Sequence, residues 1–294
     1  MVAVCLAGPA LVVLFLSGAY AKSLVGFNEA HIKKLTKAGA DAFIAKYIRG
    51  GSAFRSLVMR EFNMMNREPL YLLNGPFVVV LMPLIVGIMF VVQKDMIFSD
   101  PDMAGVMALI DGGFGAVLAA LIGAMLGSFS SITCTGGSRD AKALPFIKSL
   151  PVKAGTYLLA KLAHGLIFAV LGSFIGVGLI TLVLKLGFID FLSGLAVSLS
   201  LSSLLNMGGL WLDTANPRLS WDNPIAAMKQ NPNAVIAMLG SMGLMGGAGW
   251  LVFRLSMGLG SFALWFGLIP ALVFGILLAL YPKYAEKRLA VMEA

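Results

Sequence analysis

Charged side chains are scarce in this chain, and residues that hold metals or perform acid–base chemistry are few. Only 12% of the residues are charged, and there are two histidines and two cysteines. Cys5 lies in an apolar run and Cys134 at the end of another, so these thiols indicate neither a disulfide framework nor a metal site. The sequence contains no Gly-x-x-x-x-Gly-Lys-Ser/Thr phosphate loop and no His-Glu-x-x-His motif. We therefore expect no enzyme, no metal and no cofactor in this chain.

Apolar residues dominate what is present. They make up 59% of the 294 residues, and the mean hydropathy is +0.91. A soluble domain of this length cannot bury that much apolar surface, so the composition predicts an all-α polytopic membrane protein. The net charge of +8 is interpreted as topogenic charge and not as a nucleic-acid surface.

Seven windows are long and apolar enough to cross a bilayer, which takes about 20 helical residues. They are residues 2–21, 71–93, 104–132, 155–185, 188–212, 233–253 and 259–282.

The distribution of basic residues orients these spans. Eighteen Lys and Arg residues lie in the segments 22–70, 133–154, 213–232 and 283–294, against three in the opposite connections. Because cytoplasmic loops carry the excess of basic residues, the chain is expected to start outside and to end in the cytoplasm of a cell membrane.

An outside start without a preceding hydrophilic segment leads us to expect that span 2–21 is the last helix of a missing membrane half. The alternative is a signal peptide, since Ala19-Tyr20-Ala21 has the small-x-small pattern of a cleavage site. Cleavage would leave the nine basic residues of 22–70 outside, against the charge rule.

Residues 53–68 have apolar side chains at helical spacing with charged residues between them. This pattern predicts an amphipathic elbow helix in the membrane interface, and Pro69 favours a break before the next span. We expect residues 71–294 to form a six-span domain after this helix.

The connections 133–154 and 213–232 are long for loops of a compact membrane domain. In the first, AKALPFIKSLP predicts a short amphipathic helix. In the second, Asn216-Pro217 marks a turn and Pro224 favours the start of another short helix. Both loops are therefore interpreted as structured surfaces for a cytoplasmic partner, although ordinary polar linkers are the alternative.

Ionisable residues within predicted spans are candidates for a transport pathway. Asp111 lies in one span, while Lys161 and His164 share a face of another. The alternative is that Lys161 extends to the interface and that the pair serves packing and hydrogen bonding.

Pairs of glycines four residues apart let helices approach closely. The pairs are Gly123/Gly127, Gly172/Gly176 and Gly243/Gly247.

Five ordered motifs resemble those of the large putative ABC exporter permeases of Firmicutes, a family of ABC-2 type permeases, across residues 52–294. These motifs are Arg67-Glu-Pro-Leu-Tyr-Leu-Leu-Asn74, Ser138-Arg-Asp, Lys148-Ser-Leu-Pro-Val152, Pro217-Arg-Leu-Ser-Trp-Asp-Asn223 and Lys229-Gln-Asn231. The chain departs from the family pattern at Asp140-Ala141, where Glu-Gly is usual. Family members are also about twice as long, with a preceding membrane half.

The resemblance implies a permease subunit of an exporter, driven by a separate ATP-binding subunit that holds ATP and Mg²⁺ and paired with a second permease half. The expected cargo is amphipathic, such as a lipid-like, peptide or drug-like molecule. The residues that the resemblance places at the contact with the ATPase are Ser138, Arg139, Asp140, Lys148, Ser149, Leu150, Pro151, Pro217, Arg218, Trp221, Asn223, Lys229 and Gln230.

Two other functions stay open at this stage. One is a proton-coupled carrier or channel that uses Asp111, Lys161 and His164, and the other is a membrane scaffold or sensor that transports nothing.

Overall fold

The structure is a computed structural model that describes residues 52–98, 113–128 and 131–292. The predicted span 2–21, the segment 22–51 and Asp111 lie outside the described residues. Helices and short turns, without any strand, make up the described part, in agreement with the predicted all-α class. The longer helices are α3 (Ala53–Arg67), α5 (Pro76–Phe98), α7 (Gly115–Ser128), α10 (Ala154–Val183), α11 (Phe188–Ala215), α13 (Pro232–Arg254) and α15 (Ile269–Val291).

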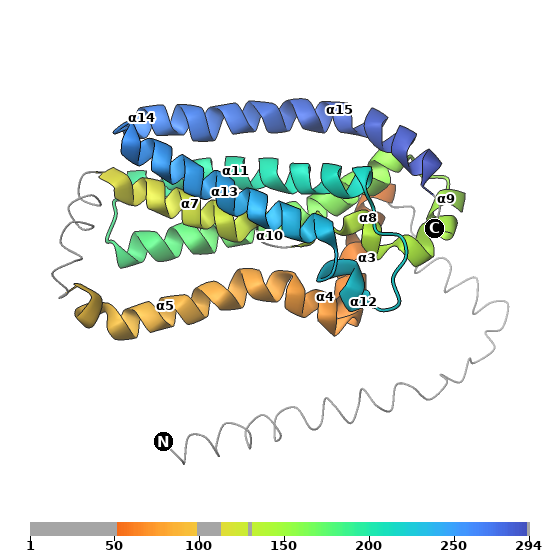
Figure 1. The fold of residues 1–294 in the computed structure, drawn as a ribbon, viewed down its shortest axis with the longest axis horizontal. Helices are drawn as coiled ribbons and strands as arrows, with labels where there is room; N and C mark the ends of the chain where they lie inside the picture. The colour runs from red at the N-terminus through yellow and green to blue at the C-terminus, as the bar shows by residue number, and fades with distance from the viewer. Residues whose placement is uncertain (1–51, 99–112, 129–130, 293–294) are drawn as a thin grey trace, which may run out of the picture. The chain divides into compact units, whose positions relative to one another are not determined.

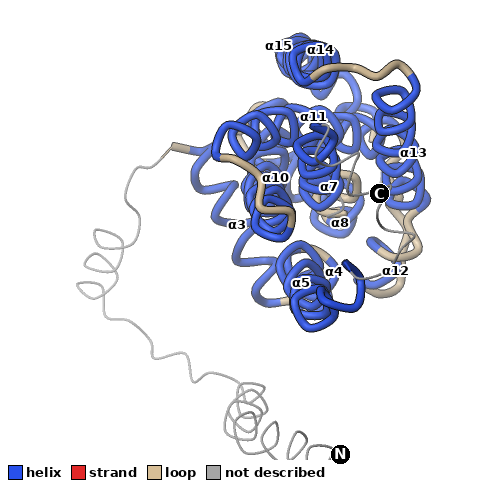
Figure 2. Tube along the Cα trace, turned by 90° about the vertical axis from the view of Figure 1, so that its left-hand side faces the viewer, coloured by secondary structure: helices blue, strands red, loops and turns tan. Residues whose placement is uncertain are grey.

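Helix α7 lies at the centre of the bundle and packs against both α10 and α11 (Figure 1). Figure 2 looks along the bundle and shows α5 on the α10 side, α15 beyond α11, and α13 beside α7. Helix α14 (Leu259–Phe262) and the π-helical segment η3 (Ala263–Leu268) lead directly into α15. The core at this level is formed by small and branched apolar side chains of α7, α11 and α13.

Glycines set the close contact between α7 and α10. A Cβ on Gly176 would lie 2.7 Å from the Cα of Gly123, and one on Gly172 would lie 2.9 Å from the Cα of Gly127. Two of the predicted glycine pairs are therefore confirmed as a helix–helix contact. For the third pair, Gly243/Gly247 on α13, no other helix of the described residues comes within 4 Å of a Cβ at either position.

The chain is a multi-pass membrane protein by the length and composition of its helices. Four helical stretches are long and apolar enough to cross a bilayer: Ala154–Val183, Phe188–Ala215, Pro232–Arg254 and Leu259–Val291. Shorter apolar helical stretches occupy Phe77–Met89 and Gly115–Ser128. Large apolar side chains on α5, α13 and α15 point away from the protein, as expected for helices whose solvent is lipid.

The segments before and between the long helices follow the sequence pattern closely. The predicted elbow helix is α3, and Pro69 starts a separate short helix, α4 (Pro69–Asn74), as a proline at the first helical position does. The predicted amphipathic helix in 133–154 consists of η2 (Ala141–Ala143) and α9 (Leu144–Ser149), preceded by α8 (Gly136–Arg139). Pro224 opens α12 (Pro224–Met228), as predicted.

The last helix is longer than the sequence pattern indicates. The apolar window ends at residue 282, but α15 continues to Val291 with Pro282 inside it. Helix α15 packs tightly here, since a Cβ on Gly155 would lie 2.9 Å from the Cβ of Pro282. This packing stabilises a polar helical extension that hydropathy alone does not reveal.

Candidate functional site

Most motif residues gather at one end of the bundle, at the right in Figure 1. Here α10 begins, α11 ends, α13 begins and α15 ends, and the short helices α8, α9 and α12 lie among them. We call this region the polar end. It is where the sequence places the basic cytoplasmic segments.

A buried ion cluster, formed by Arg60, Glu61, Arg139, Asp140 and Lys161, connects α3 with α8 and α10. Its centre is Lys161, whose Nζ lies 2.8 Å from Glu61 Oε1 and 2.7 Å from Asp140 Oδ2. The side chains of Lys161 and Glu61 are 0% and 1% exposed. A lysine in an apolar helix is costly without counter-ions, so these two carboxylates account for its position.

Asp140 is held by three side chains from two helices, α3 and α10. Arg60 of α3 forms a bidentate pair with it, at 2.8 and 2.9 Å, and the hydroxyl of Tyr157 in α10 donates to Oδ2 at 2.6 Å. Burial alone would raise the pKa of Asp140, but the charges and hydrogen bonds of Lys161 and Arg60 outweigh it and hold the pKa well below its usual range. Asp140 is therefore an ionised carboxylate with all its partners inside the protein.

Arg139 completes the ion cluster on the side of Tyr71. Its Nη2 lies 3.5 Å from Glu61 Oε2 and donates to the carbonyl of Ile132 at 3.0 Å, and its guanidinium lies over the Tyr71 ring. The ion cluster thus contains three cations and two carboxylates. Because each carboxylate contacts at least two cations, removal of either one leaves positive charges uncompensated.

A third buried carboxylate, Asp213 near the end of α11, holds α8 from the other side. It accepts the backbone N–H of Gly137 at 2.6 Å and that of Ser138 at 3.1 Å, together with the Ser138 hydroxyl. Asn233 at the start of α13 donates to it at 3.2 Å. Helix α8 is therefore fixed to α3 and α10 through charges and to α11 through hydrogen bonds to Asp213, which α13 also contacts through Asn233.

Ser138 joins two of the family-like motifs. Its hydroxyl accepts the backbone N–H of Arg218 at 2.9 Å, and its carbonyl accepts the indole N–H of Trp221 at 2.8 Å. The ammonium of Lys142 lies 4.5 Å from the centre of the Trp221 ring. The loops 133–154 and 213–232, predicted separately from the sequence, therefore form one hydrogen-bonded surface.

The motif residues divide into an interior and an exterior set. Ser138, Arg139 and Asp140 are buried, so they position the backbone of the loop and do not present their own side chains to a partner. The predicted contact residues that are exposed are Lys148, Ser149, Pro151, Asn223, Lys229 and Gln230; Leu150, Pro217, Arg218 and Trp221 are partly buried. The most exposed apolar side chain of the loop is Phe146, at 66%.

The two predicted pathway residues that the structure describes, Lys161 and His164, have different neighbours. Lys161 is engaged with Glu61 and Asp140, whereas the His164 ring packs edge-on against Phe62 and Phe168, with centroids 4.5 and 5.3 Å away. Neither ring nitrogen of His164 has a hydrogen-bond partner among the described residues. Within this part of the chain the two side chains belong to different surroundings, one ionic and one aromatic.

Sequence reasoning missed the partners of these charges. It assigned Glu61 to the polar face of an interfacial helix and treated Lys161 as a candidate pathway residue, with extension to the interface, packing and hydrogen bonding as the alternative. It also overlooked Asp213 at the end of an apolar helix. The available signal was the charge itself, since an ionisable group in an apolar helix requires a partner on another element.

No group of His, Cys, Asp and Glu among the described residues could hold a metal ion. Comparisons with protein-family models, with curated proteins and with solved structures return no match to this chain.

Proposed function

We propose that this chain is the membrane-spanning permease subunit of an ABC-2 type exporter, with six spans after the elbow helix. The observation that carries the proposal is the attachment of α8 to the three helices α3, α10 and α11 at the polar end. A loop that only connects two spans does not require ion pairs to α3 and α10 and hydrogen bonds to a buried carboxylate of α11. A loop that receives force from outside does.

The exterior of the same loop has the composition of a docking surface. Phe146 is exposed on α9, between the exposed Lys142 and Lys148. Aromatic anchors are typical of the residues that dominate protein–protein binding energy, and charges around them favour a partner of opposite charge. The partner that fits has an apolar pocket with acidic residues at its rim.

The mechanism follows from the connections of α8. A partner ATPase that closes on ATP displaces α9, and α8 transmits the displacement to α10 through the ion cluster and to α11 and α13 through Asp213. Because these links are short and buried, the helices move with the loop and do not let it slide past them. The chain contributes no chemistry of its own in this proposal; ATP and Mg²⁺ belong to the partner, and a second permease half completes the pathway.

The test is affinity purification of the tagged full chain from its native membranes, followed by identification of co-purified chains and by ATPase assay. We expect a subunit with a phosphate-loop motif and vanadate-sensitive ATP hydrolysis. Phe146→Ser should reduce the co-purified ATPase at least tenfold, because truncation of an aromatic anchor costs about 2 kcal/mol or more. The matched control is Phe188→Ser, an exposed phenylalanine at the opposite end of the bundle, which should retain it.

Two results contradict the proposal. One is a purified complex without any ATPase, combined with unchanged cell physiology after the sequence of α9 is scrambled, which would favour a scaffold or sensor. The other is transport that persists without ATPase but stops when the proton gradient is removed, which would favour a proton-coupled carrier.

A further inference from the structure

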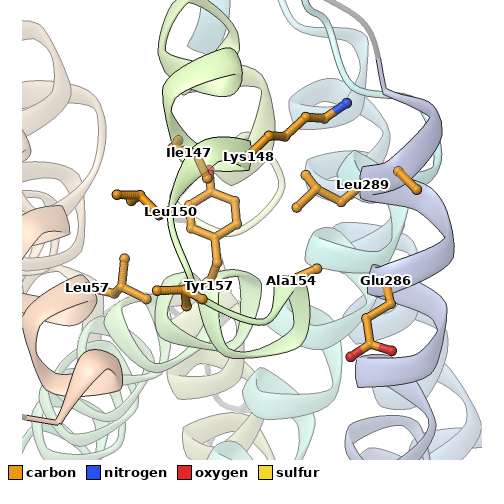
Figure 3. Close-up of a pocket in the computed structure, with 10 residues that line it drawn as sticks. Leu57, Ile147, Lys148, Leu150, Ala154, Tyr157, Glu286 and Leu289 are labelled. Carbon is orange, nitrogen blue, oxygen red and sulfur yellow. The ribbon is translucent and has the colours of Figure 1, made fainter.

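A cleft of about 320 Å³ opens at the polar end between α3, the turn after α9, the start of α10 and the end of α15 (Figure 3). Its walls are mainly apolar, and Tyr157 lies among them. The apolar residues that line it are Leu57, Ile147, Leu150, Val152, Ala154, Leu289 and Ala290. This volume is at the lower end of the range for ligand pockets, enough for part of an acyl chain and not for a whole lipid.

One cation and one carboxylate line the cleft, and two further lysines are adjacent in the sequence to residues that line it. Lys148 and Glu286 belong to its lining, Lys153 lies between two lining residues, and Lys287 follows Glu286. All four side chains are exposed. The Lys148 ammonium donates to the carbonyl of Met292, just beyond α15, and an ammonium has two further donors for a ligand oxygen. Three cations against one carboxylate complement an anion.

The position of the cleft beside two candidate membrane spans indicates which class of anion it would bind. Helices α10 and α15 are both among the candidate membrane spans, and the cleft lies where α10 begins and α15 ends. Its basic residues belong to the side that the charge distribution assigns to the cytoplasm. That leaflet carries the anionic lipids, and basic pockets between membrane helices on this side bind their head groups.

We infer that this cleft binds an anionic phospholipid, with part of an acyl chain against the apolar lining and the phosphate at Lys148 and Lys153. A single lipid here contacts α3, the α9 turn and α15 at once. Tyr157 lines the cleft and also donates to Asp140, so an occupied cleft packs directly against the ion cluster. This inference rests on the membrane location of the helices and stands independently of the proposed export function.

The experiment measures lipid binding to the purified full chain in detergent by native mass spectrometry and by thermal unfolding. Phosphatidylglycerol is compared with phosphatidylcholine of the same acyl chains. We expect tighter binding and a higher unfolding midpoint with phosphatidylglycerol. The double variant Lys148→Gln/Lys153→Gln should weaken phosphatidylglycerol binding about 30-fold, from the usual contribution of two lysines at an anionic surface, and leave phosphatidylcholine binding unchanged.

The matched control is Lys185→Gln/Arg254→Gln, which removes two exposed cations at the opposite end of the bundle and should retain the preference. A second variant, Leu289→Trp, fills the apolar part and should also reduce phosphatidylglycerol binding. Soluble glycerol 3-phosphate should not stabilise the wild-type chain, because it lacks the acyl chain that the cleft accommodates.

Several outcomes would overturn the inference. Equal affinity for phosphatidylglycerol and phosphatidylcholine would show that the cleft has no preference for anionic lipid. An equal loss of phosphatidylglycerol binding in the control variant Lys185→Gln/Arg254→Gln would show that the attraction is nonspecific. Full stabilisation by glycerol 3-phosphate identifies a site for free anions. Unchanged lipid binding by Leu289→Trp, with loss of a co-purified ATPase, assigns the cleft to a protein partner.

Discussion

The ion cluster makes a quantitative prediction about the pair of Glu61 and Lys161. In Glu61→Gln the three cations Arg60, Arg139 and Lys161 keep only Asp140 as a counter-ion, in a site where Glu61 and Lys161 are at most 1% exposed. Removal of one partner from a buried pair typically costs 3–5 kcal/mol, because the remaining charge cannot be solvated. We therefore expect Glu61→Gln to lower the free energy of unfolding by about 3–5 kcal/mol.

The double variant Glu61→Gln/Lys161→Met separates this charge effect from lost packing. It removes one charge of each sign and leaves Arg60 and Arg139 with Asp140, so the excess of one positive charge is the same as in the wild type. The cost of the double variant should be smaller than the sum of the single costs by about 1–3 kcal/mol, the coupling found for residues in direct contact.

The assay is reversible unfolding of the full chain in mixed micelles, followed by circular dichroism, for the wild type, both single variants and the double variant. Arg55→Gln on the exposed side of α3 serves as the control and should change the free energy by no more than about 0.5 kcal/mol. Additive single effects, or a neutral Glu61→Gln, would show that Glu61 and Lys161 do not form the buried pair.

Further predictions concern the glycines, Ser138 and Asp140. Gly176→Ala should destabilise the bundle by about 1–3 kcal/mol because its Cβ would lie 2.7 Å from Gly123, whereas Gly243→Ala on the open face of α13 should not; thermal unfolding of both variants compares them directly. Ser138→Ala removes a donor from Asp213 and an acceptor from the backbone N–H of Arg218, so it should lower the free energy of unfolding by about 2 kcal/mol in the same assay. An unchanged free energy of unfolding would refute the bridging role of Ser138. Since the pKa of Asp140 is lower in the folded than in the unfolded state, its stabilising contribution is complete above a pH of about 5 and is lost progressively as the pH falls further. Asp140→Asn should therefore be less stable at pH 7 and should lose less stability than the wild type on acidification, and parallel pH profiles would contradict this.

Local patterns in the sequence predicted the elements that depend on neighbouring residues. The apolar spacing of 53–68 and Pro69 located α3 and the break after it, because both depend on interactions within one or two turns. The glycine spacing predicted close packing equally well for α10 and for α13, but only α10 has a helix against those glycines. The partner of a face lies elsewhere in the chain, and spacing within a helix contains no information about it.

The contacts within the candidate site could not be predicted for the same reason, because they join residues that are far apart in the sequence. The motifs at Ser138 and Trp221 were predicted to face a partner, and the structure shows that they are bonded to each other. Lys148, predicted as an ATPase contact, also lines a cleft, and its ammonium is bonded to the carbonyl of Met292 just beyond α15. These relations join residues about 80 and 144 positions apart, so no local pattern could reveal them.

The sequence by itself determined that this is a helical membrane protein with a basic side and a structured loop on that side, because hydropathy, charge and turn chemistry act over short distances. The tertiary structure alone decided which charges are paired. It placed Glu61 of an apparently interfacial helix 2.8 Å from a lysine inside an apolar span and thereby turned two isolated charges into the link between the loop and the bundle. The physical reason is that burial of a charge depends on a counter-ion from another element, and only the folded chain brings that element to it.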